Sequence, residues 1–582
     1  MHAEVLTTPK FYGKDITSTM TDQTIYRLEE AMAQIEEVMK ICGSPSISLG
    51  VINEGKVIFR KSLGYRDVDQ RLEADSDSLY MMGSCSKMYT AAAVGKLVDE
   101  GKVSWTDPIQ KYLPEFNPVG DPEIGQKADI IDAFRHSTGL ENPTRLYVGP
   151  SQTLLKDDKD FIEVMNQMPT ANDEGQRFNR HWAYNNGAVG LMAKVVERVS
   201  GVTFSDYVRE NVLEPLGLRR TMLSRADIKN DDNIAYPHAQ LSDGSFTMFE
   251  SLDWPCDNNS PMLAALGIEA SLNDVLSWCI AVMSAEREEQ QLQSQAPNSS
   301  KATSSPLKQL GRIRKGYWTR PVDDDFKNEA AYCMGWIRIG LPSSMLGSFS
   351  YNHASRKEGN KWHLKNIIGT ESAPRLAIGH TGGVTGALSN IWTFPETQSA
   401  VVALANGRTY GDASDFTNQI LMQSLFNLKP RVDFVPWAKK EVELARQLIE
   451  NDLIKPWKEN RSKVDVASCK KNQHLYIGDY QLFDGKYVLS VVEKSEDPDA
   501  NECNLALVYN HVSHLRNGLE FSDKHAFTTF TGSRDNSLRI GNPSARFDST
   551  IVKFDVDETK SQVKGVWWHC LGEKPAWLPR VN

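Results

Sequence analysis

Apolar runs separated by turn residues predict strands near both ends of the first 430 residues. Over residues 45–66, the runs SISLGVI and KVIFRKSLGY flank Asn53-Glu54-Gly55, which predicts a hairpin. Over residues 376–406, the segments RLAIGHTGG, ALSNIWTF and AVVALAN are divided by turn residues and predict a meander of three strands.

Two segments between these strands have the spacing of helices. Apolar residues recur at helical intervals from Met88 to Val98, and Gly101 is a plausible stop. A second apolar face runs over 187–200 and ends at Gly201. Strands at both ends with helices between them predict an α+β fold, in which helices pack on an antiparallel sheet.

Polar segments divide the rest of the chain. Residues 286–306 are polar and low in complexity, so we expect a mobile surface insertion. Residues 436–454 predict a connecting helix, followed by Pro456 and a charged stretch. We therefore expect a first domain over 1–430, a linker helix within 431–464 and a second domain over 465–582.

Beyond about residue 465 the pattern changes to short alternating strands. Gly, Asn and Asp turns separate YVLSVVE, LALVYN, HAFTTFT, STIVKFDV and VKGVWWHC. This pattern predicts a small all-β barrel or sandwich.

Composition and charge exclude several classes of protein. A chain of 582 residues is too long for a single core. A net charge of −10 makes a broad nucleic-acid-binding face unexpected, and no apolar stretch has the length of a membrane helix. The first residues lack the apolar core of a secretory signal, and the eight cysteines show no zinc spacing. We expect a cytoplasmic protein with reduced cysteines, no metal, no nucleic-acid partner and no membrane partner.

Ser84 is a candidate nucleophile because Lys87 follows it by one helical turn. A buried lysine has a lowered pKa and can take a proton from a neighbouring hydroxyl. Ser-x-x-Lys also begins at Ser305, Ser468 and Ser561, but only Ser84 opens a well-formed helix. The alternative is a helix-capping serine beside a solvated lysine.

Two further motifs are candidates for chemistry. In Tyr184-Asn185-Asn186, a lysine ammonium would favour the tyrosine phenolate as a base; the alternative is a structural tyrosine and a capping asparagine. In 380–383, the sequence His-Thr-Gly-Gly ends a predicted strand, where glycines let a ligand approach the backbone; the alternative is a turn after an edge strand.

These motifs, in this order, resemble the serine β-lactamase and penicillin-binding-protein family, in its class C β-lactamase, DD-peptidase and esterase branch. The resemblance covers about residues 25–430. It includes GSCSKMYTAAAVGKLVDEGK, IIDAFRHSTGLEN, FNRHWAYNNGAVGLMAKVVERVSGVTF and LGIEASLNDVLSW. It implies an antiparallel sheet flanked by helices, with an all-helical subdomain, and makes 1–430 the catalytic domain. The segment HLYIGDYQL resembles the lipocalin-like barrel appended to some peptidases of this family.

The resemblance also implies a role for each site residue. Ser84 would form an acyl-enzyme, and Lys87 and Tyr184 would share the base and acid work. The N–H groups of Ser84 and Gly383 would form the oxyanion hole, and no cofactor would be required. The residues expected to bind substrate are Asn186, His380, Thr381 and Gly382.

The substrate is less defined by the sequence than the chemistry. His380 stands where many β-lactamases carry lysine, which weakens a claim of antibiotic hydrolysis. We expect a hydrolase of a small ester, amide or lactam, with fungal secondary metabolism as the analogy. An acyltransferase, transesterase or cyclase using the same nucleophile and a non-catalytic binding protein of the same fold are the alternatives. The oligomeric state is left open.

Overall fold

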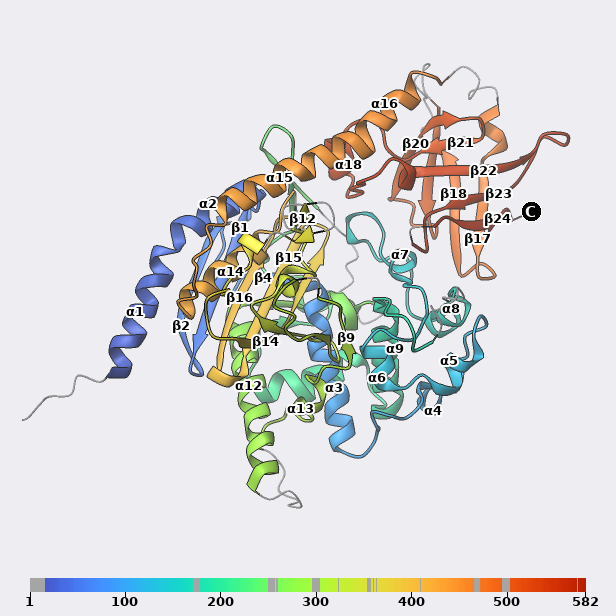
Figure 1. Cartoon of the computed structure of the whole chain (residues 1–582). Coiled ribbons are helices and arrows are strands. Elements are labelled where there is room, and N and C mark those ends of the chain that lie inside the picture. Colours follow the sequence, from blue (N-terminus) through green and yellow to red (C-terminus); the bar gives the residue numbers. More distant parts are fainter. Residues whose placement is uncertain are drawn as a thin grey trace, which may run out of the picture.

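The computed structural model has an α+β domain and a C-terminal β-domain joined by a long helix (Figure 1). It describes residues 16–170, 178–249, 257, 260–295, 304–322, 324–352, 357–358, 361–362, 364–408, 410–464, 472–494, 503–572 and 574–581. In this part of the chain, no helix is both long and apolar enough to cross a membrane.

A nine-stranded antiparallel sheet forms the centre of the first domain, in the order β3-β2-β1-β16-β15-β14-β11-β10-β9. The predicted hairpin and meander are confirmed as neighbours, since Leu49 of the hairpin pairs with Ala403 of the last meander strand. The strands are β1 (Ser46–Asn53), β2 (Lys56–Asp67), β3 (Leu72–Glu73), β9 (Trp318–Thr319), β10 (Ala330–Tyr332), β11 (Ile337–Leu341), β14 (Arg375–Val384), β15 (Ala387–Phe394) and β16 (Ser399–Ala405).

Helices cover both faces of this sheet because its strands alternate apolar side chains to each side. One face packs on α1 (Ile16–Glu30), α2 (Met32–Cys42) and α14 (Ala413–Leu425). The other packs on α12 (Leu272–Gln295) and on the turn before α3 (Ser86–Asp99). Both predicted helices are confirmed: α3 ends near Gly101, which has a φ of 69°, and α9 (Asn186–Ser200) ends at Gly201.

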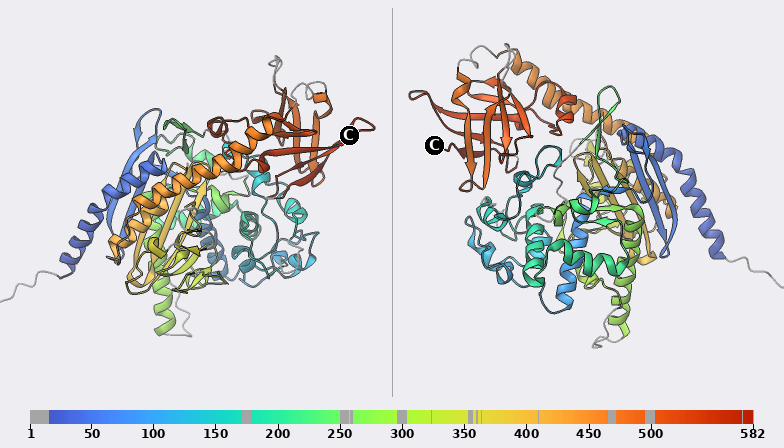
Figure 2. Two further views of the ribbon diagram at one scale, coloured as in Figure 1. Left: turned by 45° about the horizontal axis from the view of Figure 1, so that its top comes forward. Right: turned by 180° about the vertical axis from the view of Figure 1, so that it is seen from behind.

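The region between α3 and α12 is mainly helical, as the resemblance implied. Figure 2 shows it beside the sheet, below the C-terminal domain. Its helices are α4 (Ile109–Tyr112), α5 (Pro122–Lys127), α6 (Ile130–Phe134), α7 (Thr144–Tyr147), α8 (Phe161–Gln167), α9, α10 (Phe204–Val208) and α11 (Arg225–Ile228). The short strands are β4 (Leu79–Met81), β5 (Thr221–Met222) and β8 (Glu269–Ser271), which form one small sheet, and the pairs β6 (His238–Gln240) with β7 (Phe246–Met248) and β12 (Lys357–Glu358) with β13 (Lys361–Trp362).

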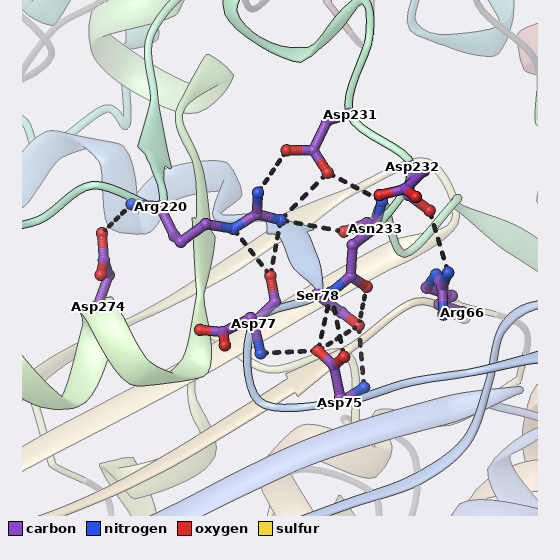
Figure 3. Close-up of polar contacts among 9 residues, drawn as sticks. All are labelled: Arg66, Asp75, Asp77, Ser78, Arg220, Asp231, Asp232, Asn233 and Asp274. Atoms are coloured by element: carbon purple, nitrogen blue, oxygen red, sulfur yellow. Dashed lines mark hydrogen bonds and ion pairs between the residues drawn. The ribbon is translucent and has the colours of Figure 1, made fainter.

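A polar cluster fixes the start of β4, the strand that leads to Ser84 (Figure 3). The Arg220 guanidinium donates to the Asp77 carbonyl at 2.8 Å and forms an ion pair with Asp231. Asn233 donates to the Asp75 carboxylate at 2.9 Å, and its carbonyl accepts from the Leu79 N–H at 2.9 Å. The cluster therefore anchors the chain just before the turn that carries Ser84.

The expected mobile insertion over 286–306 is wrong for its first ten residues, because α12 is helical to Gln295. The Glu286 carboxylate is buried and accepts from the buried Arg314 guanidinium at 2.6 Å. The Glu289 carboxylate accepts from the backbone N–H groups that open α13 (Leu310–Ile313). Partners distant in sequence thus order a segment whose composition is polar, while residues 296–303 lie outside the described residues.

The connecting helix is longer than expected. It runs as α15 (Val435–Ile449), a π-helical turn and α16 (Lys455–Arg461), so it continues through Pro456. Pro456 has no backbone N–H to donate to the preceding helical turn. The π-helical turn just before it is wider than an α-helical turn, so the helix continues past Pro456 without a break. In Figure 1 this helix lies along the first domain and reaches the C-terminal domain.

The C-terminal domain is an eight-stranded antiparallel barrel that is nearly closed, because Tyr480 of the first strand pairs with Arg580 after the last. Cys503, just before β19, is disulfide-bonded, so the expectation that all cysteines are reduced is wrong there. A short helix, α18 (Arg534–Arg539), follows the fifth strand. The strands are β17 (Gly478–Leu482), β18 (Tyr487–Glu493), β19 (Leu505–Tyr509), β20 (Arg516–Asp523), β21 (Ala526–Thr528), β22 (Ile551–Asp557), β23 (Gln562–Trp568) and β24 (Ala576–Pro579).

Hydrogen bonds to backbone carbonyls join the barrel to the segment around α7. The Arg145 guanidinium donates to the carbonyls of His569 and Gly572, both at 3.1 Å. The Ser151 N–H donates to the Gly541 carbonyl at 2.9 Å. This segment of the first domain is thus attached to the barrel at two points.

Candidate active site

Ser84 lies on a 3₁₀ turn, Gly83–Cys85, between β4 and α3. The turn is held from two sides: the Met82 N–H donates to the Ile268 carbonyl at 2.8 Å, and the Ser389 hydroxyl donates to the Met82 carbonyl at 2.7 Å. Ser84 is half-buried on this fixed support, while its neighbours in the turn are buried.

Lys87 is fully buried, and its amine has three neighbours. Nζ donates to Asn186 Oδ1 at 2.7 Å and to the Ala265 carbonyl at 2.8 Å, and it lies 3.2 Å from Ser84 Oγ. Burial holds the pKa of Lys87 well below its usual value. A neutral amine has two hydrogens for the two carbonyl acceptors, which leaves its lone pair for the Ser84 hydroxyl.

The Tyr184 hydroxyl donates to Ser84 Oγ at 2.7 Å, and Lys87 Nζ lies 4.7 Å from the centre of the Tyr184 ring. Burial raises the pKa of Tyr184, although its hydrogen bond with Ser84 lowers it. The expected favouring of the phenolate is therefore wrong for the free site, because loss of hydration outweighs any neighbouring charge. Tyr184 rests as a phenol with a proton to give.

The two asparagines after Tyr184 have different tasks. Asn185 is the capping residue: its side chain accepts from the Ala188 N–H at 3.1 Å and begins α9. Asn186 points the other way, toward Lys87, and its amide nitrogen donates to Thr144 Oγ1 at 2.9 Å. The capping alternative thus holds for Asn185, and Asn186 is held as an acceptor for the amine.

Strand β14 passes close to the Ser84 turn. Gly83 has a φ of +50°, and a Cβ placed on it would lie 2.7 Å from Gly383 N. A Cβ on Gly382 would overlap the Met82 carbonyl oxygen. The glycines therefore bring the Gly383 backbone N–H beside Ser84, while the Thr381 hydroxyl donates to the Phe349 carbonyl at 2.9 Å.

Gly382→Ala is expected to push β14 away from the Ser84 turn and to lower kcat/KM about 100-fold, since a misplacement of about 1 Å can cost that much. Steady-state kinetics with an ester substrate would measure it. Gly311→Ala is the matched control, because a Cβ there meets no neighbour closer than 3.7 Å. Equal activity of the two variants would contradict the close approach.

His380 is buried, and two partners inside the protein engage its ring nitrogens. Its Nε2 lies 2.9 Å from the Tyr332 hydroxyl, and its Nδ1 lies 2.5 Å from the Thr381 carbonyl. Burial lowers the pKa of His380 to about 3, with a further lowering from Lys87. In this arrangement the ring is neutral and both nitrogens are engaged within the protein.

The structure thus brings Ser84, Lys87, Tyr184 and Asn186 together, with the β14 backbone beside them and His380 behind Tyr332. Tyr332, Thr144 and Ala265 also join the network, and no spacing in the sequence connects these three to the motifs. Across the described ranges, no group of three or more His, Cys, Asp or Glu side chains could hold a metal ion.

Comparisons with known proteins identify relatives of this chain. A protein-family model described as Beta-lactamase matches residues 32–423. An unguisins hydrolase of Aspergillus violaceofuscus is 23% identical over 430 residues, covering 71% of this chain and 67% of that protein. A putative D-alanyl-D-alanine carboxypeptidase of Escherichia coli is 30% identical over 31% of this chain and 44% of that protein.

Two further comparisons concern a shorter match and the fold. A teichoic acid D-alanine hydrolase of Staphylococcus aureus is 25% identical over 30% of this chain and 40% of its own length. The chain thus spans less than half of this hydrolase and of the carboxypeptidase. The structure of an octameric penicillin-binding protein homologue from Pyrococcus abyssi matches with a TM-score of 0.53 and 18% identity, over 86% of this chain and 92% of that one.

Proposed function

The chain belongs to the beta-lactamase family of serine hydrolases, and from this premise we propose that it cleaves a small ester, amide or lactam through an acyl-enzyme on Ser84. One observation carries the proposal: the buried Lys87 amine has two carbonyl acceptors for its hydrogens and Ser84 Oγ as its third neighbour. That geometry suits an amine that takes a proton from the hydroxyl.

In the first step, Ser84 Oγ attacks the substrate carbonyl carbon and its proton passes to Lys87 Nζ. The negative charge that develops on the carbonyl oxygen would be met by the N–H groups of Ser84 and Gly383. Preorganised donors of this kind stabilise a transition state because they need no reorientation during the reaction. Thr381 and Gly382 would line the side of the substrate that faces β14.

In the second step, the carbonyl re-forms and the bond to the leaving amine or alcohol breaks. Tyr184 gives its hydroxyl proton to the leaving atom, and the proton on Lys87 passes to Tyr184. Water then attacks the acyl-enzyme carbonyl carbon while the neutral Lys87 amine takes a proton from that water. The bond between the acyl carbon and Ser84 Oγ breaks, this proton passes to Ser84 Oγ, and the acid is released. No cofactor enters these steps.

We infer the substrate class from the names of the relatives and from the neutral state of His380. One relative, which covers 71% of this chain, is named as a hydrolase of unguisins and comes from Aspergillus violaceofuscus. His380 is neutral, so it offers no fixed positive charge for a substrate carboxylate. We therefore favour an uncharged ester or amide of secondary metabolism, with transfer of the acyl group to an alcohol or amine as the alternative outcome.

A fluorophosphonate probe tests the proposal directly. Incubation of the full chain followed by peptide mass spectrometry is expected to locate one adduct on Ser84. Labelling at another residue would overturn the proposal. Product analysis with and without an added alcohol would separate hydrolysis from acyl transfer, because only a transferase gives the new ester as its main product.

A further inference from the structure

Three buried side chains form a hydrogen-bonded row behind Tyr184. The Tyr332 hydroxyl lies 3.1 Å from His136 Nε2 and 2.9 Å from His380 Nε2. His136 and Tyr332 are 0% exposed and His380 is 1% exposed. The mechanism proposed above uses none of the three, so their common bond to one hydroxyl needs a separate explanation.

The outer partners of the row fix the position of every hydrogen in it. The Asn185 N–H donates to His136 Nδ1 at 3.2 Å, so a neutral His136 carries its proton on Nε2 and donates to Tyr332. The Thr381 carbonyl accepts from His380 Nδ1, so His380 Nε2 has a free lone pair. The Tyr332 hydroxyl therefore accepts from His136 and donates to His380.

Both rings are neutral in this arrangement. Burial lowers the pKa of each histidine, and the nearby Lys87 lowers both further. A neutral row with one consistent set of hydrogens costs little to bury. A protonated His380 would leave two N–H groups pointing at the Tyr332 hydroxyl, and a protonated His136 would turn its Nδ1–H against the Asn185 N–H.

The row adjoins Tyr184. The ring centre of His136 lies 4.3 Å from that of Tyr184, and the ring centre of Tyr332 lies 6.3 Å from it. The Tyr332 ring meets the Tyr184 ring edge to face, so the row lies directly against the residue that donates to Ser84 Oγ. Trp182 packs on both tyrosine rings and limits their movement.

We propose that Tyr332 is a positioning residue for Tyr184, held ready by His136 and His380, and that it donates a hydrogen bond to the Tyr184 oxygen while Tyr184 protonates the leaving group. The inference rests on the proposed function. Tyr332 keeps its own proton: its O–H turns from His380 Nε2 to the phenolate oxygen and returns when Lys87 reprotonates Tyr184. No bond to Tyr332 forms or breaks.

This role follows from the surroundings of Tyr184. A phenolate that forms on the partly buried Tyr184 has lost part of its hydration, so a hydrogen-bond donor from the protein stabilises it. Lys87 Nζ lies near the face of the Tyr184 ring, and the Tyr332 hydroxyl, whose oxygen is held between His136 and His380, is the donor assigned to the phenolate oxygen. A preorganised donor lowers the barrier only for leaving groups that need a proton.

Tyr332→Phe tests the inference through leaving-group dependence. A p-nitrophenyl ester loses a stable anion without protonation, so its kcat/KM is expected to change less than about 3-fold. For the alkyl ester of the same acid, kcat/KM is expected to fall about 10- to 100-fold, a part of what a general acid contributes. Tyr89→Phe is the matched control, because the hydroxyl of the buried Tyr89 has no hydrogen-bond partner among the residues that the structure describes. An equal change for both esters, or no change, would overturn the inference.

Fluorophosphonate labelling separates this inference from the proposed function. If Ser84 is labelled in both the parent and Tyr332→Phe, the nucleophile is intact and the ester comparison judges Tyr332 alone. If Ser84 is not labelled in the parent, the proposed function fails, and the mechanistic role of Tyr332 fails with it.

The hydrogen positions have their own test, which does not depend on activity. Nitrogen-15 NMR of histidine-labelled protein, assigned with His136→Gln and His380→Gln, is expected to show protonated Nε2 at His136 and protonated Nδ1 at His380. In Tyr332→Phe, the His380 Nε2 resonance is expected to move toward that of a nitrogen without a donor. The opposite tautomer at either histidine would overturn the assignment.

Discussion

Ser84→Ala is expected to abolish covalent labelling and to lower kcat about 10⁴- to 10⁶-fold, the range seen when a nucleophile is removed. The variant removes only the Oγ that lies 2.7 Å from the Tyr184 hydroxyl and 3.2 Å from Lys87 Nζ. The turn itself should persist, since Ile268 and Ser389 hold it through the Met82 backbone. The measurements are steady-state turnover of an ester and intact-protein mass after incubation with the fluorophosphonate.

Ser561→Ala is the matched control for that result. Ser561 begins another Ser-x-x-Lys, but both Ser561 and Lys564 are exposed on the barrel. The Ser561→Ala variant should have the same kcat and the same labelling of Ser84 as the parent. Residual turnover in Ser84→Ala within 10-fold of the parent would show that another group is the nucleophile.

Lys87→Met is expected to lower kcat about 10²- to 10⁴-fold, the usual contribution of a general base. Methionine fills the same buried channel but cannot take the Ser84 proton. Lys96→Met is the matched control, because Lys96 lies on the same helix, α3, and forms only a partly exposed ion pair with Glu100. A similar loss of kcat in Lys96→Met would show that the effect comes from a disturbed α3 and not from loss of the Lys87 amine.

The pH dependence of the parent follows from the same residue. Only the neutral amine of Lys87 can accept a proton, and burial holds its pKa well below the usual value. The neutral form, and with it kcat/KM, should therefore persist to a pH well below the pKa of an ordinary lysine and fall as the pH drops through the lowered pKa of Lys87. A kcat/KM that rises only near the pKa of an ordinary lysine would contradict a neutral resting base.

Local patterns were enough to predict the elements that carry the nucleophile. The hairpin, the meander, α3 and α9 all follow from apolar spacing and turn residues, and these elements place Ser84, Lys87 and Tyr184. The prediction of Asn186 as a partner of the amine needed the family resemblance, because one sequence does not tell which of two adjacent asparagines caps the helix.

Long-range partners explain what the sequence could not predict. The first ten residues of the expected insertion are helical because Glu286 meets Arg314 and Glu289 meets the start of α13. Tyr332 reaches the site only because β10 pairs with β11, which pairs with β14. The raised pKa of Tyr184 depends on burial, which spacing alone does not measure.

The attachment of the barrel to α7 connects the C-terminal domain to Lys87, the proposed base. Thr144, which accepts from Asn186, is the direct neighbour of Arg145, which donates to the barrel at His569 and Gly572. A shift of that barrel loop would be transmitted along the backbone to Asn186 and then to the Lys87 amine. Substitutions in this barrel loop are therefore expected to alter turnover without changing any residue of the proposed site.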